Sequence, residues 1–274
     1  MEIKARLAGY RSKLKERGIT DIIAGRLRWY KQSFQMDNWL IGRLIELSGN
    51  KVTLDGIRLS LDNPLIQTRH KSTIYFGIYE EEERAMSKRF LDPALPLIEI
   101  GGSIGGVACL TNKLINNPEA HVVVECNPLV LATLEENRVL NGCKFAIEPR
   151  ALAYGAETIS FNVVTDHFMK GALGGSEGEK VTVGTVTLAE IVRAHNFESF
   201  NLISDSEGAE VDMVENEAEL LRDRAKVILL ETHAAARGQA AISKMIATLE
   251  EIGFKMVHHT PDMGAVAMVN QHFS

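Results

Sequence analysis

Glu99-Ile-Gly-Gly-Ser-Ile-Gly-Gly106 is the segment on which the predicted fold depends, because it joins an apolar run to a helical stretch. The apolar run begins at Leu97, and the helical stretch extends to Asn117. A buried strand, a glycine-rich turn and a helix in this order are typical of the first unit of an open α/β sheet. Glycine at positions 101 and 105 lets the backbone approach a ligand closely and leaves the amides of the helix N-terminus accessible.

Strands and helices alternate along the rest of the chain. Further strands of the same sheet are predicted at 121–125, 144–148, 200–205 and 226–231, other β segments at 158–164 and 181–186, and terminal strands at 254–259 and 265–270. The intervening helices are predicted at 128–141, 187–195, 208–224 and 239–253. Continuous apolar strands between helices indicate a mostly parallel α/β sheet that is covered on both faces. The link 260–264 is too short for a parallel crossover, so one strand near the C-terminus must be antiparallel.

Residues 36–75 complete a predicted N-terminal extension (1–75), which precedes the main domain (76–274). A helix from Asp37 to near Gly49 is expected to pack through Leu40, Ile41, Leu44 and Ile45. A β-hairpin over 52–61 is predicted to turn at Asp55-Gly56, a dipeptide that tolerates positive φ. After the hairpin, a helix over 80–89 is expected to pair Glu80 with Arg84, and its run of glutamates is interpreted as a solvated face.

The first 35 residues are basic, although the chain as a whole is acidic. Nine Lys and Arg against three acids give this segment a charge of +6 (9 − 3), and the chain total of −6 leaves −12 (−6 − 6) for the remainder. The acidic body argues against general nucleic-acid binding. Apolar residues at helical spacing in 3–14 and 23–34 predict two amphipathic helices that dock on the body or on a second subunit, giving a homo-oligomer.

Composition and cysteine content indicate a soluble globular protein. The chain has 274 residues, of which 45% are hydrophobic and 24% charged. No apolar stretch approaches the roughly 20 residues needed to cross a bilayer, and the N-terminus lacks a signal-peptide core. The three cysteines form no Cys-x-x-Cys pair, which argues against a disulfide or zinc framework. We therefore expect a cytoplasmic protein without a membrane span.

The residues around the glycine turn indicate which cofactor binds there. Glu125 ends the second predicted strand, where its carboxylate can accept both hydroxyls of a ribose. The dinucleotide pattern G-x-G-x-x-G is absent, and so is a P-loop, because Val107 follows Gly106. Glu99, just before the glycines, would repel a pyrophosphate but suits a ligand with an ammonium and a sulfonium group. The pattern favours S-adenosylmethionine, and a nicotinamide cofactor is the disfavoured alternative.

Several short motifs between Phe76 and Glu231 share one family pattern. They are Gly77-Ile-Tyr-Glu80, Glu99-Ile-Gly-Gly-Ser-Ile-Gly105, Val124-Glu-Cys-Asn-Pro128, Leu134-Glu-Glu-Asn137 with Leu140-Asn141, Ala151-Leu152, Thr187-Leu188 and Ser204-Asp-Ser-Glu-Gly-Ala-Glu210. Together they resemble the FkbM family of S-adenosylmethionine-dependent methyltransferases. Departures from the family pattern are Glu99 for Asp, Ser103 for Asn, Ser204 for Lys and Ala189 for Asp.

The resemblance implies a Rossmann-like class I methyltransferase sheet and a set of cofactor-binding residues. That set is Glu80, Glu99, Gly101, Ser103, Gly105, Glu125, Asn127, Ala151 and Asp205. The substituted Lys and Asp positions concern the substrate side of the site, so the acceptor is open. A small-molecule hydroxyl, on a sugar or natural product, is the favoured acceptor; N-methylation and a non-catalytic S-adenosylmethionine-binding protein are the alternatives.

Candidate acid and base residues follow the predicted strands 200–205 and 226–231. Asp205, Glu207 and His233 are ranked in that order for deprotonating or orienting the acceptor. The structural alternative for Asp205 and Glu207 is capping of the next helix. A divalent metal held by Asp205, Glu207 and Glu231 is a further alternative, less favoured than a metal-free site. The glycine-rich segment 168–180 is expected to cover the substrate.

Overall fold

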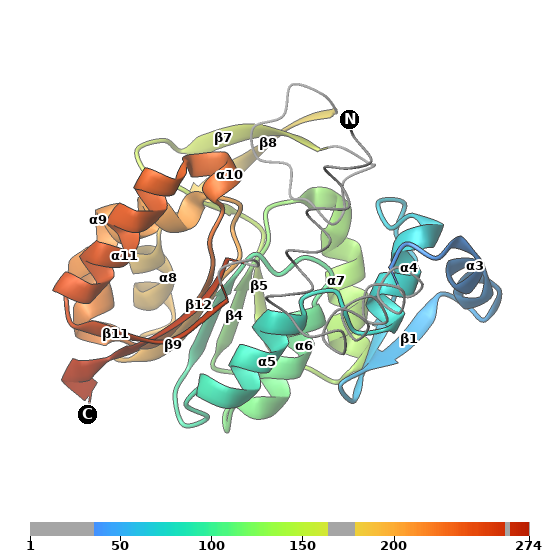
Figure 1. Cartoon of the computed structure of the whole chain (residues 1–274), viewed down its shortest axis with the longest axis horizontal. Helices are drawn as coiled ribbons and strands as arrows, with labels where there is room; N and C mark the ends of the chain where they lie inside the picture. The colour runs from blue at the N-terminus through green and yellow to red at the C-terminus, as the bar shows by residue number, and fades with distance from the viewer. Residues whose placement is uncertain (1–35, 164–178, 261–263, 274) are drawn as a thin grey trace, which may run out of the picture.

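A seven-stranded sheet forms the centre of the computed structural model, which describes residues 36–163, 179–260 and 264–273 (Figure 1). The strands in spatial order are β11 (Phe254–Thr260), β12 (Ala265–Asn270), β10 (Ala225–Glu231), β9 (Phe200–Ser204), β3 (Leu97–Ile100), β4 (His121–Val124) and β5 (Ala146–Glu148). β12 is antiparallel to both of its neighbours, and the remaining pairs are parallel. This confirms the predicted Rossmann-like sheet with one antiparallel strand near the C-terminus.

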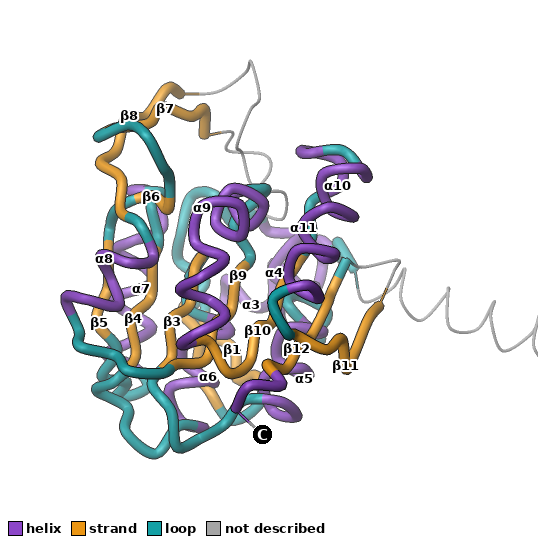
Figure 2. Tube along the Cα trace, turned by 90° about the vertical axis from the view of Figure 1, so that its left-hand side faces the viewer, coloured by secondary structure: helices purple, strands orange, loops and turns teal. Residues whose placement is uncertain are grey.

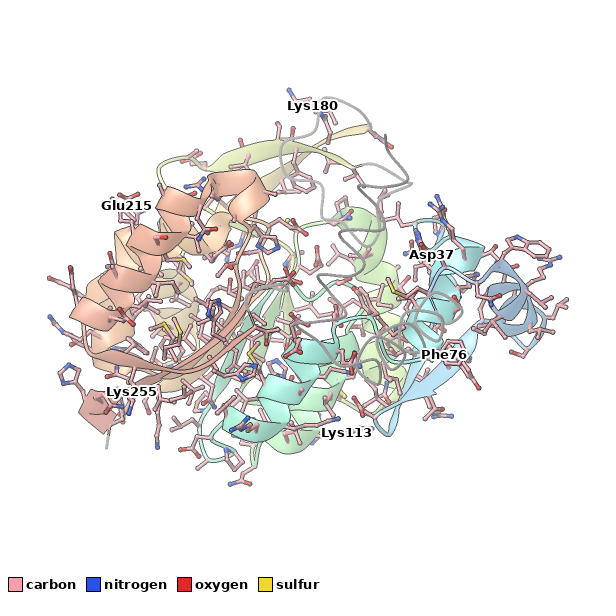
Figure 3. All side chains as sticks on the ribbon, in the orientation of Figure 1. Asp37, Phe76, Lys113, Lys180, Glu215 and Lys255 are labelled. Atoms are coloured by element: carbon pink, nitrogen blue, oxygen red, sulfur yellow. The ribbon has the colours of Figure 1, made fainter. Side chains whose placement is uncertain are left out.

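Helices cover both faces of this sheet (Figures 1 and 2). One face carries α5 (Glu81–Phe90), α6 (Gly106–Leu114) and α7 (Pro128–Leu140); the other carries α8 (Leu188–Ala194), α9 (Ala209–Arg224) and α11 (Gln239–Glu251). Because side chains alternate along a strand, Ile98 and Ile100 of β3 pack with α8, α9 and α11, whereas Leu97 packs with α5 and α6. Figure 3 shows side chains filling the space between the sheet and both helical layers. The short helix α10 (Ala234–Arg237), which follows β10, was not predicted.

The described part of the N-terminal extension packs onto the α6–α7 side. It consists of α3 (Trp39–Leu47), β1 (Lys51–Leu54), β2 (Ile57–Ser60) and α4 (Thr68–Tyr75). The hairpin prediction is confirmed, and both turn residues have positive φ, 51° at Asp55 and 78° at Gly56. Ile57 and Leu59 share a hydrophobic core with Ala108 of α6 and Leu134 of α7. The predicted helices over 3–14 and 23–34 lie outside the described residues.

Two asparagines attach the hairpin to the main domain: Asn137 lies in α7, and Asn141 is the C-cap of that helix. Asn137 accepts a hydrogen bond from the Ser60 amide (2.6 Å) and donates to the carbonyls of Ser60 (3.2 Å) and Ile104 (2.8 Å). Asn141 similarly accepts from the Arg58 amide (2.9 Å) and donates to the Arg58 carbonyl (2.6 Å). The family-like motif Leu134–Asn141 therefore holds the edge strand β2 in place.

α3 packs through only part of the predicted face. Ile41 and Ile45 pack as predicted, but Leu40 and Leu44 are 63% and 55% exposed, so the prediction that these two pack is wrong. The close contact is instead made at Gly42, where a Cβ would lie 1.6 Å from the Thr68 carbonyl oxygen of α4. This approach turns the helix so that Ile45 is buried and a face with Trp39, Leu40 and Leu44 remains exposed.

A second, three-stranded sheet lies beside the main one. Its strands are β6 (Ala151–Leu152), β8 (Glu179–Val186) and β7 (Thr158–Val163), in that order (Figure 2). The two β segments predicted between the third and fourth strands therefore pair with each other and not with the main sheet. Most of the glycine-rich segment 168–180 lies outside the described residues.

The interpretation of the 80–89 helix as a solvated face is wrong. Glu83 and Arg84 are buried, because α5 packs against α6 and β10. Arg84 does not pair with Glu80; its guanidinium donates to Asp55 (2.8 Å) and to the carbonyls of Gly77 and Tyr79. Glu80 has a φ of 52° and precedes the helix, so it is not on the same helical face as Arg84.

None of the helices within the described ranges is both long and apolar enough to cross a membrane.

Candidate active site

The glycine turn brings the carboxyl ends of β3 and β9 together. Gly101 has a φ of 92°, and a Cβ there would lie 1.7 Å from the carbonyl oxygen of Asp205. The Asp205 amide donates to the Ile100 carbonyl (2.9 Å), which fixes the residue after β9 beside the turn. Gly105, with a φ of 88°, is the N-cap of α6. Glycine is required at 101 because any side chain would separate these two backbone segments.

Glu125 closes the neighbouring strand β4 and faces the same turn. Its Oε2 accepts a hydrogen bond from the Ser103 amide and its Oε1 from the Asn127 amide, both at 2.7 Å. Burial raises the pKa of this carboxyl to about 7, although the two backbone hydrogen bonds oppose the increase. Each carboxylate oxygen has a second lone pair, so Glu125 can still accept a hydroxyl on each side. The structure thus brings Ser103, Glu125 and Asn127 together, as expected for a ribose site.

Tyr79 and Glu80 reach the turn from the segment before α5. The Tyr79 hydroxyl and the Ser103 hydroxyl are 2.9 Å apart. The Oε2 atom of Glu80 is buried and has no hydrogen-bond partner within the described residues. It lies where a Cβ of Gly106 would be 2.4 Å away, at the start of α6. Burial raises the pKa of Glu80 to about 8, and the charge of Asp205 adds to this increase.

Glu99 lies beneath α6 and apart from the carboxyl ends of the strands. It is 1% exposed, because the alternation along β3 places it on the same side as Leu97. Its Oε2 accepts from the Thr111 hydroxyl (3.2 Å) and is 3.7 Å from Nε2 of His121. Burial raises the pKa of Glu99 to about 8. Glu99 thus contacts Thr111 and His121 in the interior and not Glu125 or Ser103.

Ala151 belongs to the second, three-stranded sheet and not to the glycine turn. It is buried at the start of β6, in register with Thr185 of β8. Its assignment as a cofactor-binding residue remains a prediction.

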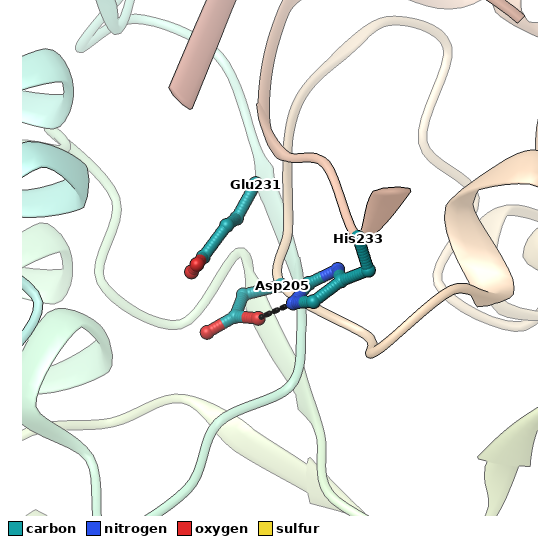
Figure 4. A group of neighbouring side chains, drawn as sticks. All are labelled: Asp205, Glu231 and His233. Carbon is teal, nitrogen blue, oxygen red and sulfur yellow. Dashed lines mark ion pairs between the residues drawn. The ribbon is translucent and has the colours of Figure 1, made fainter. Parts of the chain in front are cut away.

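The predicted acid and base residues converge on one imidazole. Nε2 of His233 is 3.4 Å from Oδ1 of Asp205 and 3.6 Å from Oε2 of Glu207. Figure 4 shows Asp205, Glu231 and His233 pointing toward a common space at the ends of β9 and β10. On its other side, Nδ1 of His233 is 3.2 Å from Oε1 of Glu210, which also accepts the His233 backbone amide (3.1 Å).

The charges in this cluster determine how His233 can act. Burial lowers the pKa of His233, but hydrogen bonds with Asp205 and Glu210 outweigh it and raise the pKa to about 11. Burial also raises the pKa of Glu210, and the interactions with His233 outweigh it, so this pKa lies below its usual value. His233 is therefore an imidazolium at neutral pH in this arrangement. That state makes His233 a charge partner of the acids and not a base.

Sequence reasoning missed Glu83 and gave Glu231 only a secondary place. Glu83 of α5 lies near enough to Glu231 at the end of β10 for the two carboxyls to affect each other's pKa. Burial raises the pKa of Glu231 to about 8, and the charges of Asp205 and Glu83 add to this increase. No local signal marks Glu83, because it belongs to a run of four glutamates and is selected only by the packing of α5 on β10.

The strand order, the glycine turn after β3 and the acids at the carboxyl ends of β4, β9 and β10 define a Rossmann-like methyltransferase fold. Residues 99–256 match the model of the methyltransferase FkbM domain. This match covers more than half of the chain, which therefore belongs to the FkbM family of S-adenosylmethionine-dependent methyltransferases. No curated protein matches the sequence.

Solved structures with a similar fold are distant in sequence. The methyltransferase FkbM from Methylobacillus flagellatus KT is 12% identical, with a TM-score of 0.43 over 77% of this chain and 56% of that one. Precorrin-6y C5,15-methyltransferase from Geobacter metallireducens GS-15 is 15% identical, with a TM-score of 0.40 over 69% and 86%. The ribosomal protein L11 methylase from Lactobacillus delbrueckii subsp. bulgaricus is 12% identical, with a TM-score of 0.39 over 70% and 76%.

Proposed function

We propose that this methyltransferase acts on a hydroxyl group of a sugar or another small-molecule or natural-product acceptor. The observation that carries the proposal is the position of Asp205, which the close approach at Gly101 holds beside the glycine turn. A carboxylate there can accept the hydrogen of an acceptor hydroxyl next to the cofactor. Glu207 also follows β9, and its Oε2 is 3.6 Å from Nε2 of His233. It can bind a second polar group of the acceptor.

The residues present fit S-adenosylmethionine. The buried Oε2 of Glu80, which lacks a partner within the described residues, suits the ammonium of the methionine moiety. Glu125 suits the ribose hydroxyls, and Ser103 and Asn127 hold its carboxylate in place. When bound, S-adenosylmethionine supplies an electrophilic methyl group on a sulfonium. We further propose that Gly101, Gly105 and Asp205 line this site; Glu99 and Ala151 support it from within the fold.

The proton of the acceptor hydroxyl must leave during methyl transfer. Asp205 is the proposed recipient, because it lies at the carboxyl end of β9 next to β3. His233 is a positioning residue in this scheme: Glu210 holds Nδ1, so that Nε2 stays directed at Asp205.

N-methylation is the second candidate, and the protonation state of His233 favours it. With His233 an imidazolium, the bases of the site are carboxylates, which are weak, and an uncharged amine requires no strong base. A comparison of sugars with the corresponding amino sugars separates the two candidates. Incubation with S-adenosylmethionine that carries a labelled methyl group, followed by mass spectrometry, shows whether oxygen or nitrogen is methylated.

The substitution Asp205→Asn tests the role of Asp205. We expect the single-turnover rate at saturating cofactor to fall by about 10²–10⁴-fold, the usual contribution of a positioned acid or base. Affinity for S-adenosylmethionine, measured by calorimetry, should stay within about threefold, a free-energy change below 1 kcal/mol. Asn retains the size of Asp, and Asp205 does not cap α9, whose N-cap is Gly208, so the fold should be preserved.

The matched control is Asp212→Asn. Asp212 lies on α9, where it is half-exposed and pairs with Arg237, and its replacement should not change the rate. A turnover rate of Asp205→Asn close to that of the control would remove Asp205 from the chemistry.

A further inference from the structure

Three potential metal ligands lie together at the ends of β9 and β10. One oxygen of Asp205, one of Glu231 and one ring nitrogen of His233 are all within 4.8 Å of one another (Figure 4). A first-row divalent ion lies about 2.0–2.2 Å from such oxygen and nitrogen atoms, so neighbouring ligands of one ion are about 3–3.6 Å apart. Binding of an ion would therefore draw the three side chains together by up to about 1–2 Å.

The hydrogen bonds of His233 select the nitrogen that can bind an ion. Nδ1 donates to Oε1 of Glu210, a fully buried residue. The other oxygen, Oε2, accepts hydrogen bonds from the Gly208 amide (2.8 Å) and the Ser206 hydroxyl (3.1 Å). Nε2 is therefore directed at Asp205, 3.4 Å away. A carboxylate that fixes the far nitrogen of the ring is the usual support of a metal-bound histidine.

The surroundings of the cluster carry an excess of negative charge that a cation would balance. Glu83 of α5, which packs on β10, is 7% exposed, and Oε2 of Glu207 lies 3.6 Å from Nε2 of His233. Negative groups gathered around one point attract a cation.

We propose that Asp205, Glu231 and His233 form a site for a divalent transition-metal ion. Two carboxylates and an imidazole suit Mn²⁺, Fe²⁺ or Zn²⁺ better than Mg²⁺ or Ca²⁺, which prefer oxygen ligands alone. Three protein ligands leave coordination positions open, where an acceptor hydroxyl would bind and become more acidic, and its proton would pass to the Asp205 oxygen that does not bind the ion. This last role rests on the proposed function; binding of the ion itself does not.

The test is a titration of the full-length, chelator-treated protein with Mn²⁺, followed by the electron paramagnetic resonance signal of the free ion. We expect one ion per chain. Glu231→Gln, which preserves size, and His233→Ala should each weaken binding by at least tenfold, and Glu210→Gln by about 10–100-fold, the usual effect of losing the partner of a ligand. The control Glu215→Gln removes an acid of α9 that is 59% exposed, and it should bind as wild type does.

Two results would overturn the metal site. One is the absence of wild-type binding with a Kd below about 1 mM. The other is equal affinity in wild type, Glu231→Gln and Glu210→Gln, with unchanged circular dichroism showing that all three are folded. Calorimetry with S-adenosylmethionine on the same samples separates this proposal from the proposed function: cofactor binding without Mn²⁺ binding overturns the metal site alone. Mn²⁺ binding without cofactor binding supports the metal site and contradicts the cofactor assignment.

Discussion

Glu125 combines two tasks in one side chain. Its two oxygens hold the amides of Ser103 and Asn127, and their remaining lone pairs are directed at the position proposed for the ribose. This dual use explains why a buried acid is present although burial raises its pKa. Cofactor affinity and local order at the turn therefore depend on the same residue.

Glu125→Ala should weaken S-adenosylmethionine binding by about 1.5–3 kcal/mol, the range for a hydrogen bond to a charged group. Calorimetry measures this loss directly. Glu119→Ala, which removes an exposed acid just before β4, serves as the control and should bind normally. If the affinity of Glu125→Ala is unchanged, the ribose is bound elsewhere.

Individual site residues differ in how far the sequence could predict them. Gly101, Ser103, Glu125 and Asp205 could be located, because each follows a predicted strand and the carboxyl ends of parallel strands meet at one edge. The direction of Glu99 depends on the face to which β3 turns it, which spacing alone does not define. Glu83 belongs to the cluster only because α5 packs on β10, a long-range contact with no local pattern.

Among the elements, the attachment of the hairpin to α7 is a distinctive feature. Asn137 is fully buried and satisfies three backbone groups of β2 and the glycine turn. Asn141 makes a similar exchange with Arg58 at an exposed position. The edge strand β2 thereby gains partners for backbone groups that would otherwise be unpaired.

Asn137→Ala should lower the free energy of unfolding by about 2–4 kcal/mol, because it leaves several buried backbone groups without partners. Asn141→Ala should cost only about 0.5–1.5 kcal/mol, since water can replace its side chain. Urea unfolding of both variants provides the comparison. Equal losses in the two variants would show that burial of the Asn137 network contributes nothing extra.

The elements of the main sheet were predicted correctly because their apolar patterns are strong, whereas α4 was missed. α4 (Thr68–Tyr75) is largely polar, yet His70, Lys71 and Ser72 are buried in it. Its polar groups bond to neighbours, as Lys71 does to Glu46 (2.9 Å) and Asn50 (2.8 Å). A helix that is stabilised by such specific contacts has no hydrophobic periodicity to reveal it.

At the scale of the molecule, the part of the chain that the structure describes contains several buried acids, and stability should depend on pH accordingly. Burial raises the pKa of four carboxyls to between about 7 and about 8: Glu80, Glu99, Glu125 and Glu231. Above the unfolded-state pKa of about 4.3, the native state holds more protons than the unfolded state, so stability falls as the pH rises. The stabilisation from protonated His233 is complete below about pH 6.5 and is lost toward pH 11, in the same direction.

Stability should therefore be highest near about pH 5 and decline toward about pH 8. Below about pH 4, carboxyls with lowered pKa values, such as Glu46, lose their interactions, and stability falls again. Urea unfolding across this range measures the profile. Glu99→Gln mimics the protonated acid, so it should flatten the decline between pH 5 and pH 8; a slope equal to that of wild type would contradict the protonation of Glu99 in the native state.

The exposed apolar face of α3 concerns the molecule as an assembly. Exposed Trp39, Leu40, Leu44 and Leu47 form a type of surface that commonly marks an interaction site. Deletion of residues 1–35, the proposed docking segment, should leave cofactor affinity intact but lower solubility or change the mass in solution. Light scattering measures that mass. A truncated protein that is soluble and of unchanged mass would show that the segment does not dock.

Arg84 links the hairpin to the proposed cofactor site. Its guanidinium bonds to Asp55 in the hairpin turn and to the carbonyls of Gly77 and Tyr79, and Tyr79 in turn contacts Ser103. Segments tied through one buried side chain open together, so their amide hydrogens should exchange with deuterium at matching free energies. Ligand binding at the glycine turn should then slow deuterium uptake in the hairpin as well, in a strand that the ligand does not touch.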